Sequence, residues 1–568
     1  MKTLAPSRLC YPCSVFVAAA ISALLCGNFA QIRAETFSTA GGTLNWNSTA
    51  NWVEGTIPNA VGANAIFNSP VTNTSATLAG TSAGGGITVG SLTFNDTLAT
   101  TIGIPNGTAG GPLKFDNGGA GATILTMGSG TGNNTISATM VLNDVLTAQV
   151  DQTTAASGAG SLNLTGAISG PGAIIKQGDG LMTFGTAAKT YTGATVLNGG
   201  RTRISNIAQP SATSAFTINS GAQLTLIAAG NFAFGTGVLT LNGAGATSGP
   251  YSPFPGAIRN DTNLAVTIAN AVVLQTDTLI HVQGAATGSV TFPNTISGPG
   301  SLILMARASD ANLGQLVLTG TNTYAGGTVV NGGVLNVNSD AALGAPGSAL
   351  TLDGLFFNGF LNPILRASGN ISTTARRLIV GNVGNNIGGT IDTNGNDVTF
   401  GAGSSIAGTT LTKTGTGKLV LAGAQNYDTL TTSAGRTEIG SALMGGNAGL
   451  ATINANAATN ISVGQTLAAL NIGSGSVVTL GAPLPPAPEF VDALENRWLA
   501  PEMGDQLVGS AGGQAVPEPC STALLLGGAS PRRRRVNAAA PSRRYGQSEN
   551  STACVARMQG RCQRCRAD

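Results

Sequence analysis

The residues that could do chemistry are few in this sequence. His281 is its only histidine, so a nucleophilic triad would have one possible base, and that base lies within a predicted strand. Cys562 and Cys565 form one C-x-x-C pair without the second pair that a zinc site needs. No phosphate loop and no dinucleotide fingerprint is present. We therefore predict no catalytic, zinc or cofactor-binding residues, and interpret His281 as a packed or rim side chain.

Oxygen-bearing side chains lie close together in the stretch DTNGND at residues 392–397. Their alternating spacing suits calcium, which prefers carboxylate and carbonyl oxygens. The EF-hand pattern fails, because Gly395 is out of place and no Glu follows at the required distance. A turn between two strands is the favoured interpretation. The residues kept as candidate metal ligands are Asp392, Asn394, Asn396 and Asp397.

The composition of the chain points to strands and turns. Only 9% of the 568 residues are charged and 82 are Gly, whereas long helices need Ala, Leu, Glu, Lys and Arg in register. Thr, Val, Ile and Asn dominate instead, and Gly interrupts them every few residues. The composition therefore predicts an all-β body.

Cysteine and charge separate the ends of the chain from its body. All seven Cys lie in the first 26 or the last 49 residues, so we expect the body to be held by repetitive packing and not by disulfides. Residues 35–531 carry 14 Lys and Arg against 22 Asp and Glu, a net charge of −8, whereas residues 532–568 are strongly basic. A mildly acidic body predicts no nucleic-acid partner.

One pattern recurs along the body. Residues 180–204 and 314–337 share the order apolar run, Tyr, Gly, Thr-Val, Asn-Gly-Gly, apolar run, and residues 417–439 repeat it with one residue fewer between Tyr and Gly. The first two copies extend backwards to residues 136 and 268, so a unit of about 130 residues is duplicated. Such repeats predict an array in which each unit covers the apolar face of its neighbour.

Each copy contains short apolar runs separated by turns in which Gly and Asn tolerate positive φ. Three strands and three corners in about 23 residues predict one coil of a parallel β-helix, with successive coils about 4.8 Å apart. A string of tandem β-sandwiches is the competing architecture, because regularly spaced short strands also fit it.

These copies resemble the autotransporter-associated β-strand repeat family, whose units run as an apolar strand, Asn-x-Tyr-x-Gly-x-Thr, then Gly and another apolar strand. The resemblance implies a right-handed parallel β-helix on a secreted surface protein. Copy one has Lys189 at the Asn position, and copy three has Thr429 at the Gly position. The motif residues are Tyr191, Gly193, Thr195 and Gly200 in copy one, Asn322, Tyr324, Gly326, Thr328 and Gly333 in copy two, and Asn426 and Tyr427 in copy three.

The stretch VPEPCSTALLLGGASPRRRR at 516–535 resembles the PEP-CTERM sorting signal of bacterial extracellular proteins. That resemblance implies transient association with the inner membrane, with the Arg block on the cytoplasmic side, and processing by an exosortase-type sorting enzyme. The apolar run is about ten residues long, half a membrane span. The matching residues are Val516, Pro517, Glu518 and Pro519, followed by Arg532, Arg533, Arg534 and Arg535.

The N-terminus has the layout of a secretory signal peptide, with basic residues, an apolar run of about twelve residues and small residues before a cleavage site after Ala34. Trp46 and Trp52 suit either sugar stacking or a cap on the first coil, and the cap is favoured. We expect no translocating barrel, because only about 90 residues follow the last repeat. The predicted parts are a signal peptide (1–34), an N-terminal β region or cap (35–135), β-helix repeats (136–480, with copies near 136–204, 268–337 and 387–439), a linker or C-terminal cap (481–515), a sorting signal (516–535) and a basic, Cys-containing tail that is disordered or aberrant (536–568).

The predicted function is mechanical and adhesive: a secreted bacterial surface or matrix protein that presents an uncharged, Asn- and Thr-rich surface to extracellular polysaccharide or neighbouring cells. The alternative is a carbohydrate-active β-helix enzyme, a polysaccharide lyase or hydrolase. Such an enzyme would need carboxylates from successive coils to converge on one face. A smooth Thr and Asn face would favour the structural role.

Overall fold

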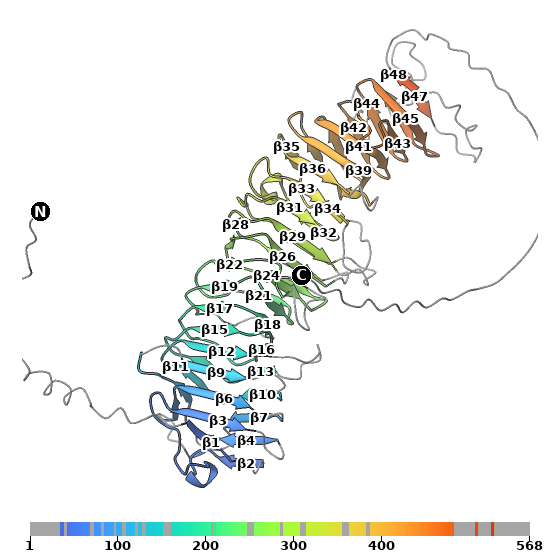
Figure 1. Ribbon diagram of the computed structural model, residues 1–568. Helices are drawn as coiled ribbons and strands as arrows, with labels where there is room; N and C mark the ends of the chain where they lie inside the picture. The colour runs from blue at the N-terminus through green and yellow to red at the C-terminus, as the bar shows by residue number, and fades with distance from the viewer. Residues whose placement is uncertain are drawn as a thin grey trace, which may run out of the picture. The chain divides into compact units, whose positions relative to one another are not determined.

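The chain forms one stack of short β-strands, seen here in a computed structural model (Figure 1). Its helical turns in the described part are η1 (Thr49–Asn51) and η3 (Asp340–Leu343), and no helix there is long and apolar enough to cross a membrane. The structure describes residues 34–481 and 506–508 and 524–526, except 39–41, 69–72, 81–84, 96–97, 105–109, 120–122, 128–131, 152–160, 206–209, 211, 247–254, 284–287, 307–313, 355–362 and 382–386.

Each coil places strands at three positions, which we call the first, second and third faces. The first face holds β1 (Ala34–Phe37), β3 (Asn64–Asn68), β6 (Ser91–Asn95), β9 (Thr123–Met127), β12 (Leu146–Val150), β15 (Ile174–Gln177), β17 (Thr195–Leu197), β19 (Phe216–Ile218), β22 (Leu239–Leu241), β25 (Val272–Leu274) and β28 (Ile296–Ser297), and after η3 β35 (Ile371–Thr373), β38 (Val398–Phe400), β40 (Lys418–Leu421), β42 (Arg436–Ile439), β44 (Ala458–Ile461) and β46 (Val477–Leu480).

The second face is a ladder that begins near the N-terminal end of the stack. It holds β2 (Gly42–Asn45), β4 (Thr74–Thr77), β7 (Thr100–Gly103), β10 (Asn134–Ile136), β13 (Ser161–Leu164), β16 (Leu181–Phe184), β18 (Gly200–Ile204), β20 (Ala222–Leu226), β23 (Ile258–Asn260), β26 (Thr278–Val282), β29 (Leu302–Ala306), β31 (Thr328–Val330), β33 (Leu350–Leu352), β36 (Arg377–Val380) and the first halves of β39 (Ser405–Thr414) and β41 (Ala424–Thr432).

The third face is shared by two ladders. The first ladder holds β5 (Ile87–Val89), β8 (Leu113–Phe115), β11 (Met140–Leu142) and β14 (Ile168–Ser169). The second holds β21 (Gly230–Phe232), β24 (Ala265–Ile268), β27 (Ser289–Phe292), β30 (Gln315–Leu318), β32 (Gly333–Val337), β34 (Pro363–Ala367), β37 (Gly389–Asp392), the second halves of β39 and β41, β43 (Ala451–Ala455) and β45 (Gln465–Ile472).

Strand pairing confirms the predicted parallel β-helix. Within the described coils every paired strand is parallel to its neighbours, as in β12 with β9 and β15. Antiparallel pairing occurs where β47 (Gln506–Val508) and β48 (Leu524–Leu526) return onto the last coil. The tandem β-sandwich alternative is wrong, because sandwich sheets are antiparallel. The first face starts at β1, so the coil begins well before residue 136.

Alternating burial explains why these sequences form strands. In β12 Leu146, Ala148 and Val150 point inward and are fully buried, whereas Thr147 and Gln149 between them are partly exposed. The same alternation repeats from coil to coil, so the inward side chains form one continuous core from Phe37 to Val478. Burying a Leu, Ile or Phe stabilises the fold by roughly 1.5–3 kcal/mol relative to exposure, and stacking replaces the missing disulfides.

Corresponding strands of the two copies of the duplicated unit lie on different faces of the β-helix. In the first copy β12, β15 and β17 are consecutive members of the first face. The corresponding strands of the second copy, β26, β29 and β31, are consecutive members of the second face. The local pattern of strands and turns was therefore preserved by the duplication, while its orientation around the axis changed by one face.

Candidate functional site

The tyrosines that mark the repeats lie inside the coil and bind the motif threonines. The hydroxyl groups of Tyr191 and Thr195 are 2.6 Å apart, and those of Tyr324 and Thr328 are also 2.6 Å apart. All four side chains are buried. Burial raises the pKa of both tyrosines above its ordinary value, against the opposing effect of the threonine hydrogen bond. The motif pair is thus a structural tie across the turn and exposes no reactive group.

The residue two positions before each motif tyrosine connects neighbouring coils. Asn322 accepts a hydrogen bond from the Ile296 backbone N–H and donates one to the Ala342 carbonyl. Lys189 takes this position in copy one and donates to the Gly166 carbonyl of the preceding coil. The motif position therefore requires a buried donor that reaches an adjacent coil, and both amide and ammonium groups satisfy it.

Glycine is needed at the motif positions for two separate reasons. A Cβ atom at Gly193 would lie 2.4 Å from the carbonyl carbon of Gly172, and one at Gly326 would lie 2.5 Å from the Ser301 nitrogen, so both glycines permit a close approach of coils. Gly200 and Gly333 instead adopt positive φ, 59° and 89°, at the start of a strand.

Copy three omits the turn that the glycine permits elsewhere. Thr429 replaces the glycine, and β41 runs through this position as one nine-residue strand. Tyr427 is buried and donates its hydroxyl to Gln425, which lies two positions before it and also donates to Ser441. Asn426, the residue assigned to the motif from sequence, faces outward and accepts from the Gly446 N–H. Gln425 is therefore the residue in the place that Asn322 occupies in copy two.

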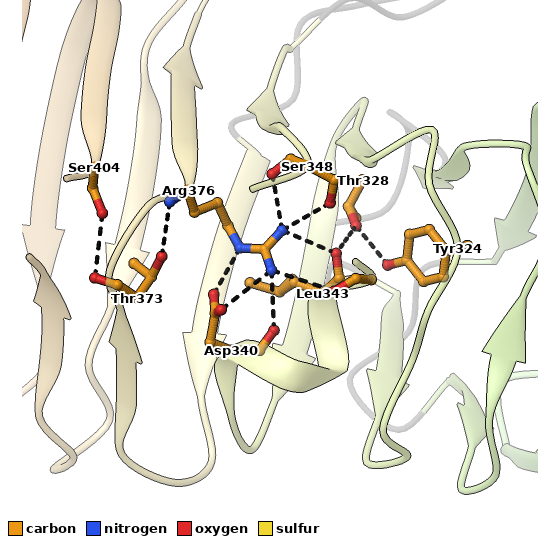
Figure 2. Close-up of polar contacts among 9 residues, drawn as sticks. Tyr324, Thr328, Asp340, Leu343, Ser348, Thr373, Arg376 and Ser404 are labelled. Atoms are coloured by element: carbon orange, nitrogen blue, oxygen red, sulfur yellow. Dashed lines mark hydrogen bonds and ion pairs between the residues drawn. The ribbon is translucent and has the colours of Figure 1, made fainter. Parts of the chain in front are cut away.

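An arginine that the sequence did not reveal connects the second copy to the next coils. Figure 2 shows the Arg376 guanidinium enclosed by the turn that contains Asp340, Leu343 and Ser348. Its Nε lies 2.7 Å from Asp340 Oδ1, and Nη1 donates to the carbonyls of Leu343 and Ser348. The Leu343 carbonyl also accepts from the Thr328 hydroxyl, so the motif pair and the arginine share one acceptor.

Buried lysines form a second kind of inter-coil tie. Lys176 donates to the carbonyls of Gly178 and of Gly199 in the next coil, and Lys413 donates to those of Thr414, Gly415 and Ala434. Both lysines belong to a Lys-x-Gly-x-Gly stretch, at 176–180 and 413–417, which is the sequence signal that would have found them.

Burial lowers the pKa of the interior lysines. Desolvation is the main cause, and it lowers the pKa of Lys176 to about 7 while the charges of Asp179 and Asp151 oppose it. The pKa of Lys189 and of Lys413 falls to about 8 for the same reason, with Asp392 opposing it at Lys413. These lysines are enclosed by backbone carbonyls, an arrangement that holds the coil together and gives no access to a substrate.

The stretch at 392–397 is a turn between β37 and β38, which was its favoured interpretation. Asp392 is 2.8 Å from the Arg366 Nε through one oxygen and accepts the Asn394 N–H through the other. Asn394 and Asn396 both donate their amide groups to the Ala367 carbonyl. Asp397 lies apart from these groups, beside Lys418.

The turn therefore uses its oxygens for ion pairing and backbone contacts. In the ranges that the structure describes, no three or more His, Cys, Asp and Glu side chains gather as a metal site would require. The structure brings Asp392, Asn394 and Asn396 together as a strand-to-strand connection.

His281 and the tryptophans are buried. His281 is 1% exposed on the outward side of β26, and its Nδ1 lies 3.0 Å from the Pro255 carbonyl oxygen. Trp46 and Trp52 are 0% and 3% exposed, and their rings pack with Phe37 and Phe67 at the first coils. The tryptophans therefore cover the N-terminal end of the core and leave no ring face for a sugar.

The outward side of the second face carries a continuous row of small polar side chains, which we call the polar row. Each member is the register partner of the next, so hydroxyl and amide groups recur about every 4.8 Å along the sheet. All are partly or fully exposed. The polar row consists of Thr43, Ser75, Thr101, Thr135, Asn163 and Thr183.

The polar row ends at Thr183, and a second polar array lies on the first face. The next register partners after Thr183 are Arg203, which is charged and partly exposed, and Thr225, which is buried. On the first face Asn242 donates its amide to Asn219, and Asn219 donates to Asn198, forming an asparagine ladder across three coils. A surface of this kind offers many neutral donors and acceptors in a flat array, which suits contact with a polymer that repeats the same groups.

The predicted sorting residues, from Val516 to Pro519 and from Arg532 to Arg535, lie outside the described residues. Ala34 begins β1, and cleavage after it stays a prediction.

Comparison with known proteins places three repeats on these coils. Residues 174–204, 311–337 and 411–432 match the family described as Passenger-associated-transport-repeat. These ranges include the tyrosine motifs of copies one and two, and Lys413 with Tyr427 in copy three.

Two curated proteins are similar to parts of the chain. The adhesin BmaC autotransporter of Brucella suis biovar 1 (strain 1330) is 38% identical over 119 residues, which is 20% of this chain and 3% of that protein. Outer membrane protein A of Rickettsia rickettsii is 31% identical over 211 residues, 35% of this chain and 9% of that protein. The chain thus spans less than a tenth of the length of either relative. No solved structure matches.

Proposed function

We propose that this chain is a bacterial cell-surface adhesive and structural protein, which uses its β-helix to present neutral polar groups to extracellular polysaccharide or to neighbouring cells. The observation that carries the proposal is the polar row, because its groups follow one face across six coils in register. The similarity to an autotransporter adhesin and to an outer membrane protein supports a surface location.

The arrangement of charge supports a binding role for this surface. Carbohydrate-active enzymes of the hydrolase type place paired carboxylates on either side of the scissile bond. The members of the polar row are uncharged. The buried Lys and Arg side chains described above bond to neighbouring coils, and the buried Tyr324 hydroxyl bonds within its own turn. A carbohydrate-active enzyme remains the second candidate from sequence, and the experiment below separates it from an adhesin.

We further propose that the chain is exported by its N-terminal signal peptide and sorted through residues 516–535, with an exosortase-type enzyme as partner and transient membrane association. The resemblance of that segment to the PEP-CTERM signal supports the proposal. Mass spectrometry of both termini, on protein recovered from the cell surface and medium, tests it. A start at Glu35 and an end near Pro519 are expected, and a chain that stays inside the cell with both ends intact would overturn it.

Substitutions on the outward side of one face test the adhesive role. Purified wild-type chain is incubated with extracellular polysaccharide from the producing cells, and bound protein is measured by co-sedimentation. Thr101→Glu with Thr135→Glu is expected to reduce binding at least tenfold, because two carboxylates interrupt the polar row. The control is Thr217→Glu with Thr240→Glu, which makes the same change on the outward side of the first face.

The outcome also separates the two candidate functions. Unchanged binding by the Thr101 and Thr135 variant would contradict the role of the polar row. Release of shortened polysaccharide by the wild type, with new chain ends detected chemically, would favour the enzyme over the adhesin.

A further inference from the structure

The last coil of the stack is only partly covered. β45 and β46 are its parallel strands, and the chain returns onto them as β48 and β47, which pair antiparallel over three residues each. β48 covers Gln465–Leu467, so residues 468–472 of β45 have no strand beyond them in the described part of the chain. An uncovered strand edge presents unpaired backbone donors and acceptors that favour pairing with another strand.

The end of the core is exposed at the same place. Leu470, Ile472 and Leu480 pack on the core but are only partly buried. Their register partners one coil earlier, among them Ile453 and Ile461, are 0–3% exposed. Aliphatic side chains that a further layer would bury are therefore left in contact with water.

Charge does not protect this edge. Residues 439–488 contain no Asp, Glu, Lys or Arg, although proteins commonly place such residues on exposed strand edges to prevent pairing. At the opposite end the edge of β1 is covered by backbone bonds from residues 51–53, and the Glu54 carboxylate accepts the Thr36 N–H at 2.6 Å. The two ends therefore differ in their capacity for strand pairing.

We propose that the outer edge of β45 and β46 is an interaction surface whose partner is the same edge of a second copy of this chain. Two identical edges related by a two-fold axis meet antiparallel, and antiparallel is the direction in which this edge already accepts β47 and β48. Head-to-tail pairing onto β1 of another copy is blocked, because the edge of β1 is covered. The proposed association, in which each edge meets the same edge of the other copy, closes as a dimer.

β47 and β48 cover part of this surface within a single chain, at Gln465–Leu467 and Val477–Thr479. Leu524–Leu526 lies inside the proposed sorting segment, so processing after Pro519 would remove β48 and uncover the edge of β45. This last step alone rests on the proposed function. Pairing of the β45 and β46 edge with a second copy depends on the last coil alone and does not depend on sorting.

The test uses the chain from Glu35 to Asp568, which keeps both covering strands, and a variant that weakens them. Leu507→Pro with Leu525→Pro removes backbone N–H donors from β47 and β48. Sedimentation velocity over a hundredfold concentration range is expected to show a monomer for the wild type and a concentration-dependent doubling of mass for the variant. Ser510→Pro with Ser521→Pro is the matched control, since these prolines lie outside both strands.

A second substitution identifies the surface. Asn471 is exposed on β45, and Asn471→Lys added to the double proline variant brings like charges together across the two-fold pair. It is expected to restore the monomer. If the double proline variant loses its β-sheet circular dichroism, Leu525→Pro alone is measured in the same way, because it disturbs only β48.

Two results would overturn the proposal: a folded uncovered variant that stays monomeric over the whole range, or a dimer that Asn471→Lys does not weaken. Neither readout involves export or polysaccharide, so a failure here leaves the proposed function standing. Equally, failure of polysaccharide binding leaves the strand-pairing surface untouched.

Discussion

At the N-terminal end of the β-helix, Trp46 and Trp52 pack with Phe37 and Phe67, and a glutamate holds the outermost backbone. At the C-terminal end, half-buried Leu470 and Ile472 pack on the core, and two short antiparallel strands pair with other parts of the last coil. Both ends must terminate the same coil, and only one does so with bulky, fully buried side chains. The difference indicates two ways to end a β-helix. Bulky side chains can pack over the last coil, or the exposed strand edge can pair with another strand.

The N-terminal aromatic cluster predicts the largest effect. Trp46→Ala removes a side chain that is 0% exposed and leaves a cavity among three rings, so the free energy of unfolding is expected to fall by about 3–5 kcal/mol. Chemical denaturation followed by circular dichroism measures it. A loss below about 1 kcal/mol would show that the cluster does not support the coils above it.

The ion pair between Asp340 and Arg376 lies in the middle of the stack. We expect it to decide whether the two ends of the β-helix unfold together. Asp340→Asn removes the charge that faces the buried Arg376 and is expected to cost about 1.5–3 kcal/mol. Because each coil contacts only its neighbours, we expect unfolding to separate into two transitions. Arg376→Met is the control variant. Combining Asp340→Asn with Arg376→Met should lower the free energy of unfolding by less than the sum of the two single losses.

The interior lysines predict a dependence on pH in both halves. Their pKa values fall from 10.5 to about 7 at Lys176 and about 8 at Lys413, so between these values and 10.5 the unfolded chain holds protons that the folded chain does not. Stability should therefore rise as pH increases from 7 to 9.5 and be lost as pH falls through 8 and 7. Above that window the raised tyrosine pKa values oppose the effect.

Urea titrations at pH 6, 8 and 9.5 measure this dependence. Lys413→Met is expected to reduce the slope between pH 8 and 9.5. A wild-type stability that falls steadily over the same range would contradict the account of the buried lysines.

The C-terminal end predicts the smallest effect. Leu470 is half-buried, so Leu470→Ala is expected to cost roughly 1 kcal/mol or less. Ile453→Ala, one coil inside, makes a comparable truncation at a fully buried register partner and should cost about 2–5 kcal/mol. Equal costs for the two variants would mean that the last coil is as well covered as the one before it.

Much of the fold could be predicted because its causes are local. Glycines at positive φ, such as Gly333, and alternating apolar residues, such as those of β12, act within a few positions of one another. The sequence could not show that the second copy had moved to another face, since this depends on how many strands separate the copies.

The ties between coils were harder to predict because their partners are distant in the sequence. Arg376 contacts Asp340, 36 residues earlier, and nothing near either residue indicates the other. Asn426 matches the motif by residue type, but the long strand that replaces a turn in copy three puts Gln425 in the buried position. The polar row became visible only when register joined single outward residues from six coils.

Hydrogen exchange of the chain from Glu35 to Asp568, followed by mass spectrometry, tests the difference between the two ends most directly. Protection is expected to be high in β1 to β3, where the aromatic cluster lies, and in the middle of the stack, and to be lowest in β45 and β46. Exchange that begins at residues 42–68, or that is equally slow at both ends, would contradict the account of a closed N-terminal end and a pairing C-terminal end.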